Sequence, residues 1–193
     1  MPVTSCRYFN GYKPCGKSNK CDHTCTSQSV ASVYILMIHL GAIGAVVRST
    51  ALLAAIHRKY PGCHLTWVTD QPSHVLLKDH SLIDQVYTTS ESDLLELSAL
   101  EFDIALVIDK SKKAAGVLAR THADQIYGFR AEPRTGAILP ATAAAKELWM
   151  LGLDNQQKFF VNKKTENQLI HEALELGSFQ NDFYDVRLST AEQ

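Results

Sequence analysis

Short apolar segments alternate with helical patterns along most of this chain, and this alternation constrains the fold more than any other feature. The first apolar segment, Val33–Leu40, is almost continuous and has the length of a strand, which is typical of a strand buried on both faces. A glycine turn follows, and then an amphipathic helix that Pro61-Gly62 ends near Tyr60. Four further strands are predicted, at His64–Thr69, Ile83–Tyr87, Phe102–Asp109 and Ala123–Tyr127. The pattern indicates an α/β fold, a Rossmann-like parallel sheet with helices on both faces.

The remaining segments complete a prediction of one main lobe with a small appendage at each end. Further helices are expected at Gln71–Leu77, Asp93–Leu100, Ser111–Arg120, Ala141–Leu151 and Thr165–Leu176. Residues 129–140 are predicted to form a loop, because the pattern of alternating strands and helices loosens after Gly128. The predicted units are therefore a cysteine-rich module at 1–30, the Rossmann-like lobe at 31–177, and a polar tail or linker at 178–193.

Composition excludes several classes of protein. The 193 residues are 46% hydrophobic, and 19 Lys and Arg side chains face 20 acidic ones. Such a balance leaves no excess of basic residues that would bind nucleic acid, and the chain carries less charge than is typical of a disordered protein. No apolar run approaches the ~20 residues that a membrane-spanning helix needs, and no basic and apolar leader opens the chain. We therefore expect a cytoplasmic protein without a transmembrane segment that binds no nucleic acid.

The glycine turn after the first strand is the main candidate for a binding site. Gly41 and Gly44 stand beyond the carboxyl end of a parallel strand, where open α/β sheets bind their ligands. The helix start at Gly44 offers free backbone N–H groups to an anion. The spacing Gly-x-x-Gly matches neither the dinucleotide fingerprint nor the phosphate-binding loop, which disfavours a nicotinamide-dependent oxidoreductase. A tight turn without any ligand is the plain alternative.

Several stretches resemble the heptosyltransferases of glycosyltransferase family 9. Leu40-Gly41-Ala42-Ile43-Gly44-Ala45 and the following helix are similar to the family's Leu-Gly-Ala-Leu/Ile-Gly-Asp opening. The order and spacing of four later stretches agree as well, and these are His57–Trp67, Leu82–Val86, Phe102–Asp109 and Ala143–Asp154. The resemblance covers about residues 33–162, and the agreement in order is more specific than any single motif.

The resemblance implies the N-terminal half of a GT-B glycosyltransferase. Family members transfer heptose from an ADP-activated donor to a lipopolysaccharide-core acceptor in the cytoplasm, and the transfer itself needs no metal. They bind the acceptor mainly on the N-terminal lobe and the nucleotide-sugar mainly on the C-terminal lobe. We therefore expect a sugar or lipopolysaccharide-core acceptor in this chain, and a nucleotide-sugar only together with a C-terminal lobe. The candidate acceptor-binding residues are His39, Gly41, Ala42, Gly44, Arg48 and Asp109.

Two departures from the family bear on activity. The chain has about half the family's length, so residues for the donor site are expected elsewhere. Ala45 stands where the family has an aspartate that is taken to be the general base, and alanine cannot accept a proton. We expect this chain alone to be inactive. A non-catalytic, zinc-containing module that recognises a glycan or a protein is the alternative interpretation, and Asp109 is expected to be a solvated strand-end residue rather than the base.

Basic residues after the predicted strands suggest an anionic acceptor, because the loops that follow parallel strands share one edge. They are Arg48, Lys110, Lys112, Lys113, Arg120, Arg130 and Arg134. A solvated lysine face is the alternative for Lys112 and Lys113, and a hydrogen-bonded core histidine is the alternative for His39. An acceptor of this kind would place the protein peripherally at the inner face of the membrane.

Four of the five cysteines lie in the first 25 residues. Cys6, Cys15, Cys21 and Cys25 supply four thiols to a segment that has too few aliphatic residues for a core, and four thiolates complete a tetrahedral structural zinc site. An iron–sulfur cluster and unliganded or disulfide-bonded cysteines are the alternatives. His23 is expected to be exposed rather than a ligand. Some family members have a similar Cys-Arg-x-Phe-x-Gly-x-x-Pro-Cys opening, and Cys63 is predicted to be a small buried residue.

Overall fold

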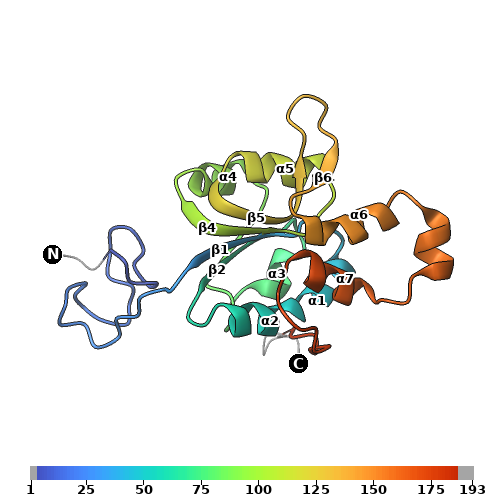
Figure 1. The fold of residues 1–193 in the computed structure, drawn as a ribbon. Helices are drawn as coiled ribbons and strands as arrows, with labels where there is room; N and C mark the ends of the chain where they lie inside the picture. The colour runs from blue at the N-terminus through green and yellow to red at the C-terminus, as the bar shows by residue number, and fades with distance from the viewer. Residues whose placement is uncertain (1–3, 187–193) are drawn as a thin grey trace.

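A six-stranded sheet forms the centre of the protein, as the computed structural model of residues 4–186 shows (Figure 1). The strand order is β3-β2-β1-β4-β5-β6, in which the first five strands run parallel and β6 is antiparallel to β5. The strands are β1 Tyr34–Ile38, β2 His64–Val68, β3 Gln85–Tyr87, β4 Glu101–Val107, β5 His122–Ala131 and β6 Ile138–Pro140. The predicted parallel α/β sheet is therefore confirmed.

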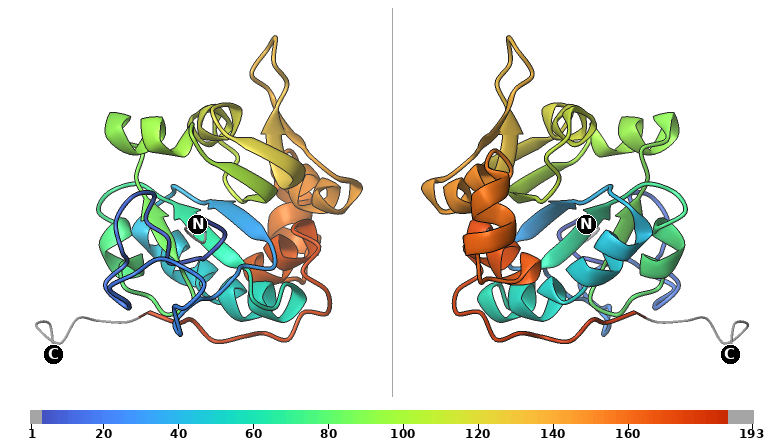
Figure 2. Two further views of the ribbon diagram at one scale, coloured as in Figure 1. Left: turned by 90° about the vertical axis from the view of Figure 1, so that its left-hand side faces the viewer. Right: turned by 90° about the vertical axis from the view of Figure 1, so that its right-hand side faces the viewer.

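Helices cover both faces of the sheet, as predicted (Figures 1 and 2). One face packs against α4 and α5, and the other packs against α1, α2, α3, α6 and α7. The helices are α1 Ile43–Ser49, α2 Leu52–Lys59, α3 His74–Leu77, α4 Glu91–Leu97, α5 Lys112–Ala119, α6 Lys146–Leu151 and α7 Glu166–Ala173. A 3₁₀ turn at Ala143–Ala145 precedes α6, and a π-helical turn at Gln157–Val161 follows it.

The near-continuous apolar character of β1 follows from this arrangement. Successive side chains of a strand point to opposite faces, so Ile35 and Met37 belong to one core cluster and Leu36 and Ile38 to the other. All four side chains are completely buried. Burial of each contributes about 1.5–3 kcal/mol to folding, which makes β1 the element on which both layers depend.

The predicted single helix between Gly44 and Tyr60 is interrupted at Thr50-Ala51, which separates α1 from α2. At this point the backbone hydrogen bonds span three residues instead of the four of an α-helix. They run from Thr50 N–H to the carbonyl of Val47 and from Leu53 N–H to the carbonyl of Thr50, both at 3.1 Å. The Thr50 hydroxyl also donates to the carbonyl of Val47 at 2.7 Å. A threonine that bonds back to its own helix bends it, and the apolar period alone does not reveal this.

The loop predicted at residues 129–140 is wrong, because β5 continues to Ala131 and pairs with β6 as a hairpin that projects from the sheet (Figure 2). Gly128 does not end the strand. It has a φ of +87°, and a Cβ atom at this position would lie 1.9 Å from the carbonyl oxygen of Val107. Glycine is therefore required where β5 pairs with Val107 of β4. In the sequence, a glycine at this point is easily taken for the end of a strand.

The two ends of the described chain pack differently against the lobe. Residues 4–30 form turns without a helix or a strand, joined by one antiparallel bridge between Cys6 and Val30. Residues 178–186 run along the helical face, where Asp182 pairs with Arg58 at 2.6 Å. Residues 1–3 of the predicted module and 187–193 of the predicted tail lie outside the described residues. Within the described range, no helix is both long and apolar enough to cross a bilayer.

Candidate functional site

A cleft of about 760 Å³ opens at the carboxyl edge of the sheet. Three segments border it, and each follows a different parallel strand. They are residues 40–44 after β1, residues 70–73 after β2, and Asp109, Ser111 and Lys113 after β4. The glycine turn therefore borders open space, as expected for a ligand-binding edge.

The two glycines of the turn serve different needs. A Cβ atom on Gly41 would lie 3.3 Å from Oδ1 of Asp109 and 3.5 Å from Nε2 of His39, so a side chain there would crowd both. A Cβ atom on Gly44 would meet only the tip of Arg48, at 3.7 Å. A side chain at position 41 is thus disfavoured by the packing beneath the turn, whereas Gly44 leaves the exposed start of α1 uncovered.

Asp109 links the ends of β4 and β1. Its Oδ2 accepts hydrogen bonds from the backbone N–H groups of Leu40 and Gly41, the latter at 3.3 Å. Its Oδ1 lies 3.9 Å from Nε2 of His39 and has no hydrogen-bond donor among the described residues. The expected solvated strand-end aspartate is therefore a half-buried carboxylate that borders the cleft, fixes the turn through one oxygen and has the other beside the ring of His39.

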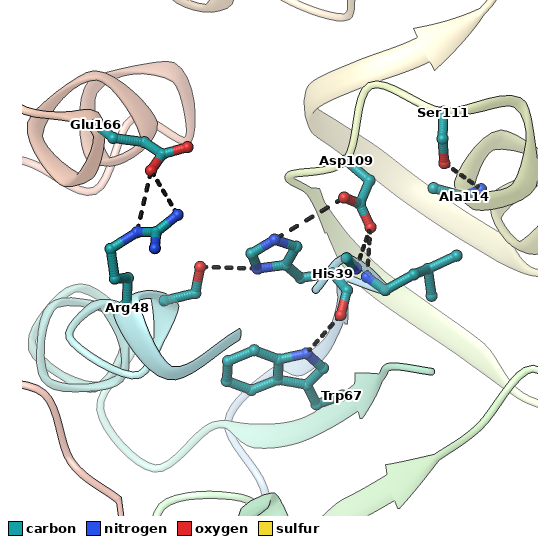
Figure 3. A network of polar contacts seen from close by, with 10 residues as sticks. His39, Arg48, Trp67, Asp109, Ser111, Ala114 and Glu166 are labelled. Atoms are coloured by element: carbon teal, nitrogen blue, oxygen red, sulfur yellow. Dashed lines mark hydrogen bonds and ion pairs between the residues drawn. The ribbon is translucent and has the colours of Figure 1, made fainter. Parts of the chain in front are cut away.

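His39 lies below the turn, where it packs as a core histidine (Figure 3). Its Nδ1 is 2.7 Å from the hydroxyl of Ser49, and its backbone carbonyl accepts a bond from Nε1 of Trp67 at 3.4 Å. Burial lowers the pKa of His39, and the nearby charge of Asp109 opposes this only in part. Because His39 is not among the residues that border the cleft, its role is to hold α1 and β2 against the end of β1.

Ala42 and Ala45 frame the start of α1 without offering a polar side chain. Ala42 is the N-cap, and its carbonyl accepts from the N–H groups of Ala45 and Val46 at 2.8 and 3.1 Å. Ala42 borders the cleft, but Ala45 is only half-exposed and does not. The position where the resembled family has an aspartate therefore carries a methyl group, and it is not among the residues that border the cleft.

The predicted gathering of basic residues is not found. Arg48 turns to α7, where its guanidinium binds the carboxylate of Glu166 at 2.9 Å (Figure 3). Lys110 lies over the ring of Phe129, 4.9 Å from its centroid. Of the seven basic residues that the sequence suggested, only Lys113 borders the cleft. The loops after parallel strands share an edge, but Arg48 and Lys110 are drawn to partners outside the cleft.

Asp70 is a cleft residue that the sequence interpretation missed. Lys113 binds its carboxylate at 2.7 Å, and the hydroxyl of Thr89 donates to it as well. Burial acts to raise the pKa of Asp70, but the hydrogen bonds from Lys113 and Thr89 lower it overall. Its only signal in the sequence is its place directly after an apolar strand, which is the signal that selected Asp109.

The N-terminal segment that contains the four clustered cysteines lies away from this cleft, on the side of the amino ends of the strands (Figure 1). All four are half-buried free thiols. Within residues 4–186, no group of three or more His, Cys, Asp or Glu side chains already stands in a metal-binding arrangement. His23 is exposed, and Cys63 is buried with its pKa raised to about 11 by that burial, so both predictions of their surroundings are confirmed.

Known structures resemble this fold. The glycosyl transferase family 9 protein from Veillonella parvula superimposes with a TM-score of 0.57 at 15% identity, over 85% of this chain and 47% of that one. The fold is similar to half of a family 9 glycosyltransferase. E. coli heptosyltransferase WaaC with ADP matches at a TM-score of 0.50 and 13% identity, over 76% of this chain and 48% of its own. This chain thus spans about half the length of the structures it matches. No protein-family model matches the sequence, and no curated protein matches it significantly.

Proposed function

We propose that this chain is the acceptor-binding lobe of a glycosyltransferase that resembles the heptosyltransferases. One observation carries the proposal: the turn at residues 41–44 borders a cleft at the carboxyl edge of a sheet whose fold is similar to half of a family 9 protein. A nucleotide-sugar site is placed outside these 193 residues. The lipopolysaccharide-core acceptor and a cytoplasmic location are parts of the same proposal and rest on the resemblance.

The side chains around the cleft suit a polyhydroxylated ligand. Asp70 and Asp109 offer carboxylate oxygens, Ser73 and Ser111 offer hydroxyls, and Lys113 offers an ammonium group. Sugar hydroxyls both donate and accept hydrogen bonds, so such a mixture can orient them. Lys113 is the one cation at this border and already pairs with Asp70. We therefore propose that the cleft binds neutral sugar units, with any phosphate of the acceptor near Lys113.

Ala45 favours a second candidate function, in which the lobe recognises a glycan or a protein without performing chemistry. A general base contributes about 10²–10⁴-fold to such reactions, and alanine supplies none. Asp109 is not assigned this role in the proposal, because its Oδ2 is bound to two backbone N–H groups and its Oδ1 lies beside the buried ring of His39, 3.9 Å from Nε2. The chain by itself is therefore proposed to bind its acceptor and not to accelerate transfer.

Nuclear magnetic resonance of the isotopically labelled chain tests the main proposal. We expect a lipopolysaccharide inner-core oligosaccharide to shift the backbone amide signals of Gly41, Gly44 and Ser111, and ADP at the same concentration to leave them unchanged. Saturable shifts with ADP at these residues would instead assign the cleft to the donor. If the oligosaccharide moves no signal around the cleft, the acceptor site is wrong.

A further inference from the structure

Residues 152–164, between α6 and α7, form an arm that projects from the lobe (Figure 1). Its first ten residues are all exposed, and the π-helical turn within it has no buried residue. The arm is nonetheless regular, because the carboxylate of Asp154 accepts the N–H of Gln157 at 3.0 Å and the carbonyl of Gln157 accepts the N–H of Asn162 at 2.8 Å. The shape of the arm is therefore set by its own hydrogen bonds, and its side chains are left open to contact something else.

Apolar side chains gather on this arm and on the end of α6 before it. Five large ones are exposed there by 47 to 70%, and we call them the apolar patch: Met150, Leu153, Phe159, Phe160 and Val161. A groove of about 670 Å³ is lined by both Met150 and Val161, so the two ends of this set share one surface. Scattered exposed apolar side chains are ordinary, whereas a gathered set marks an interaction surface.

Three exposed lysines flank the patch and form no ion pair within residues 4–186. They are Lys146, Lys158 and Lys163. The ammonium group of Lys158 lies 5.1 Å from the centroid of the Phe159 ring. A cation beside an exposed aromatic ring combines charge and apolar surface at one point. The surface of the arm is therefore both apolar and basic.

The acidic side chains nearby do not cancel this charge. Glu147 binds Lys164 at 2.8 Å, and Glu166 binds Arg48 at 2.9 Å. Asp154 is the one acidic residue of the arm, and its carboxylate accepts a backbone N–H at the start of the π-helical turn. Three lysines without an ion pair thus stand against one carboxylate, which leaves an excess of positive charge around the patch.

An anionic lipid bilayer matches this surface better than a protein does. Protein interfaces are depleted in lysine at their centre, and a second copy placed on the patch by two-fold symmetry would bring lysines against lysines. A negatively charged membrane attracts lysines, and its headgroup region accommodates aromatic side chains. We propose that the apolar patch docks on an anionic membrane. Phe159 and Phe160 insert at the level of the headgroups, and the three flanking lysines contact lipid phosphates.

The patch lies on the side of the lobe where the cleft opens. Figure 1 shows the arm projecting away from the N-terminal segment, which lies on the side of the amino ends of the strands. The ion pair between Arg48 and Glu166 joins the start of α7, directly after the arm, to α1, which follows the glycine turn. Docking through the arm would therefore keep the cleft near the bilayer that holds a lipid-linked acceptor. This last step rests on the proposed function, whereas membrane binding itself does not.

Flotation of the chain with phospholipid vesicles tests the proposal. We expect vesicles of phosphatidylcholine with phosphatidylglycerol to bind the chain roughly tenfold or more tightly than vesicles of phosphatidylcholine alone. Phe159→Ser combined with Phe160→Ser should lower binding to the anionic vesicles by about tenfold or more, because buried apolar surface supports it. Phe183→Ser is the matched control, since Phe183 is an exposed aromatic residue outside the patch, and it should bind as the wild type does.

The lysines are tested one at a time. Lys158→Gln and Lys163→Gln should each weaken binding about fivefold, because a lysine near an anionic surface contributes about 1 kcal/mol. Lys20→Gln, at an exposed position in the N-terminal segment, is the control and should leave binding unchanged. Added salt should weaken binding of the wild type, since it screens these charges. Equal binding to neutral and anionic vesicles would overturn the proposal.

Fluorescence shows whether the arm itself enters the bilayer. With anionic vesicles, Phe160→Trp should gain emission at shorter wavelength that lipids brominated in their acyl chains quench, whereas Phe183→Trp should not. Absence of this change would overturn the proposal, as would unchanged vesicle binding by the variant that lacks both phenylalanines of the arm. A concentration-dependent dimer that this variant no longer forms would assign the patch to a second copy instead.

The substituted positions are all exposed, so each variant should keep the far-ultraviolet circular dichroism of the wild type. The arm variants should also keep the amide shifts that the oligosaccharide causes at Gly41 and Gly44, because the patch does not border the cleft. This separates the two proposals. A chain that binds anionic vesicles but shows no such shifts would contradict the acceptor site alone, and a chain with the shifts but no vesicle binding would contradict the membrane surface alone.

Discussion

The carboxylate of Asp109, at the end of β4, accepts a hydrogen bond from the backbone N–H of Gly41, 3.3 Å away in the turn after β1. The same oxygen accepts the N–H of Leu40. These groups stand 68 and 69 positions apart in the chain, so the shape of the turn depends on the pairing of β1 with β4. A site that binds its ligand at the turn is therefore shaped by the sheet and not by the glycines alone.

Replacement of Asp109 tests this dependence. Asp109→Ala should lower the free energy of unfolding by about 1–3 kcal/mol, because it leaves two half-buried N–H groups unpaired. Urea denaturation measures this free energy. Asp103→Ala is the control on the same strand. Its carboxylate accepts the N–H of Tyr34 at 2.7 Å at the solvent-exposed end, where water replaces the bond at lower cost. Equal losses in the two variants would contradict the assigned role of Asp109.

The two glycines of the turn should respond in opposite ways to the same substitution. Gly41→Ala should destabilise the protein by about 1 kcal/mol, since the added methyl crowds a carboxylate oxygen at 3.3 Å. Gly44→Ala should stabilise it by about 0.5–1 kcal/mol, because alanine favours the helix and finds room there. Thermal unfolding of the pair measures both signs, and a stabilising Gly41→Ala would show that the turn is less tightly packed.

Lys113 is expected to contribute to acceptor binding at the cleft, unlike its neighbour in sequence. Lys113→Gln should weaken binding of an inner-core oligosaccharide roughly tenfold, about 1.4 kcal/mol, because it removes the one cation among the bordering residues. Lys112→Gln is the matched control, since Lys112 is exposed and lies outside the cleft. Calorimetric titration distinguishes the two, and similar affinities would exclude Lys113 from the site.

The sequence predicted the layers of the fold well because burial leaves a direct trace in it. Apolar runs such as Val33–Leu40 occur where a strand has both faces covered, and each predicted strand lies on or next to an observed one. The hairpin of β5 and β6 was missed for an equally physical reason. Gly128 has a role in strand packing that depends on Val107, and no local pattern records a contact between two strands.

The sequence predicted where in the fold the candidate site lies, but it predicted less well which side chains line it. The edge beyond β1 and β4 follows from parallel topology, which pointed to Gly41 and Asp109, and both of these residues border the cleft. The partners of charged side chains do not follow, because Arg48 binds Glu166 across 118 positions and Lys113 binds Asp70 across 43. Only the folded arrangement of β2, α5 and α7 decides which charges reach the cleft.

His171 should make stability depend on pH. It is 1% exposed in α7, and neither ring nitrogen has a hydrogen-bond partner among the described residues. Burial lowers its pKa, and the charge of Arg58 lowers it further. The pKa of histidine in an unfolded chain is about 6.5. When folding lowers this pKa, the histidine costs no stability at a pH above about 6.5. As the pH falls below that value, the unfolded chain binds the proton more readily than the folded protein, and stability falls.

Replacement of His171 by leucine measures this contribution. His171→Leu should raise the free energy of unfolding at pH 7.5 by about 1 kcal/mol, since it removes an unpaired buried polar group, and the gain should grow at pH 5.5. The exposed His122 supplies the control, because His122→Leu should change neither value measurably. A gain that shrinks on acidification would contradict the lowered pKa.

The last prediction concerns the alanine at position 45. Helix α1 has no acidic residue in its first turn and no side-chain cap, so Ala45→Asp should stabilise this chain by about 0.3–1 kcal/mol through the helix dipole. When the chain is joined to the donor-binding lobe of a family 9 heptosyltransferase, the same change should raise turnover by about 10²–10⁴-fold. Ala45→Asn introduces a side chain of nearly the same shape as aspartate that cannot accept the proton, so this variant should leave turnover low. Equal rates for the two variants would show that position 45 does not act as a base, and would favour the non-catalytic interpretation of the lobe.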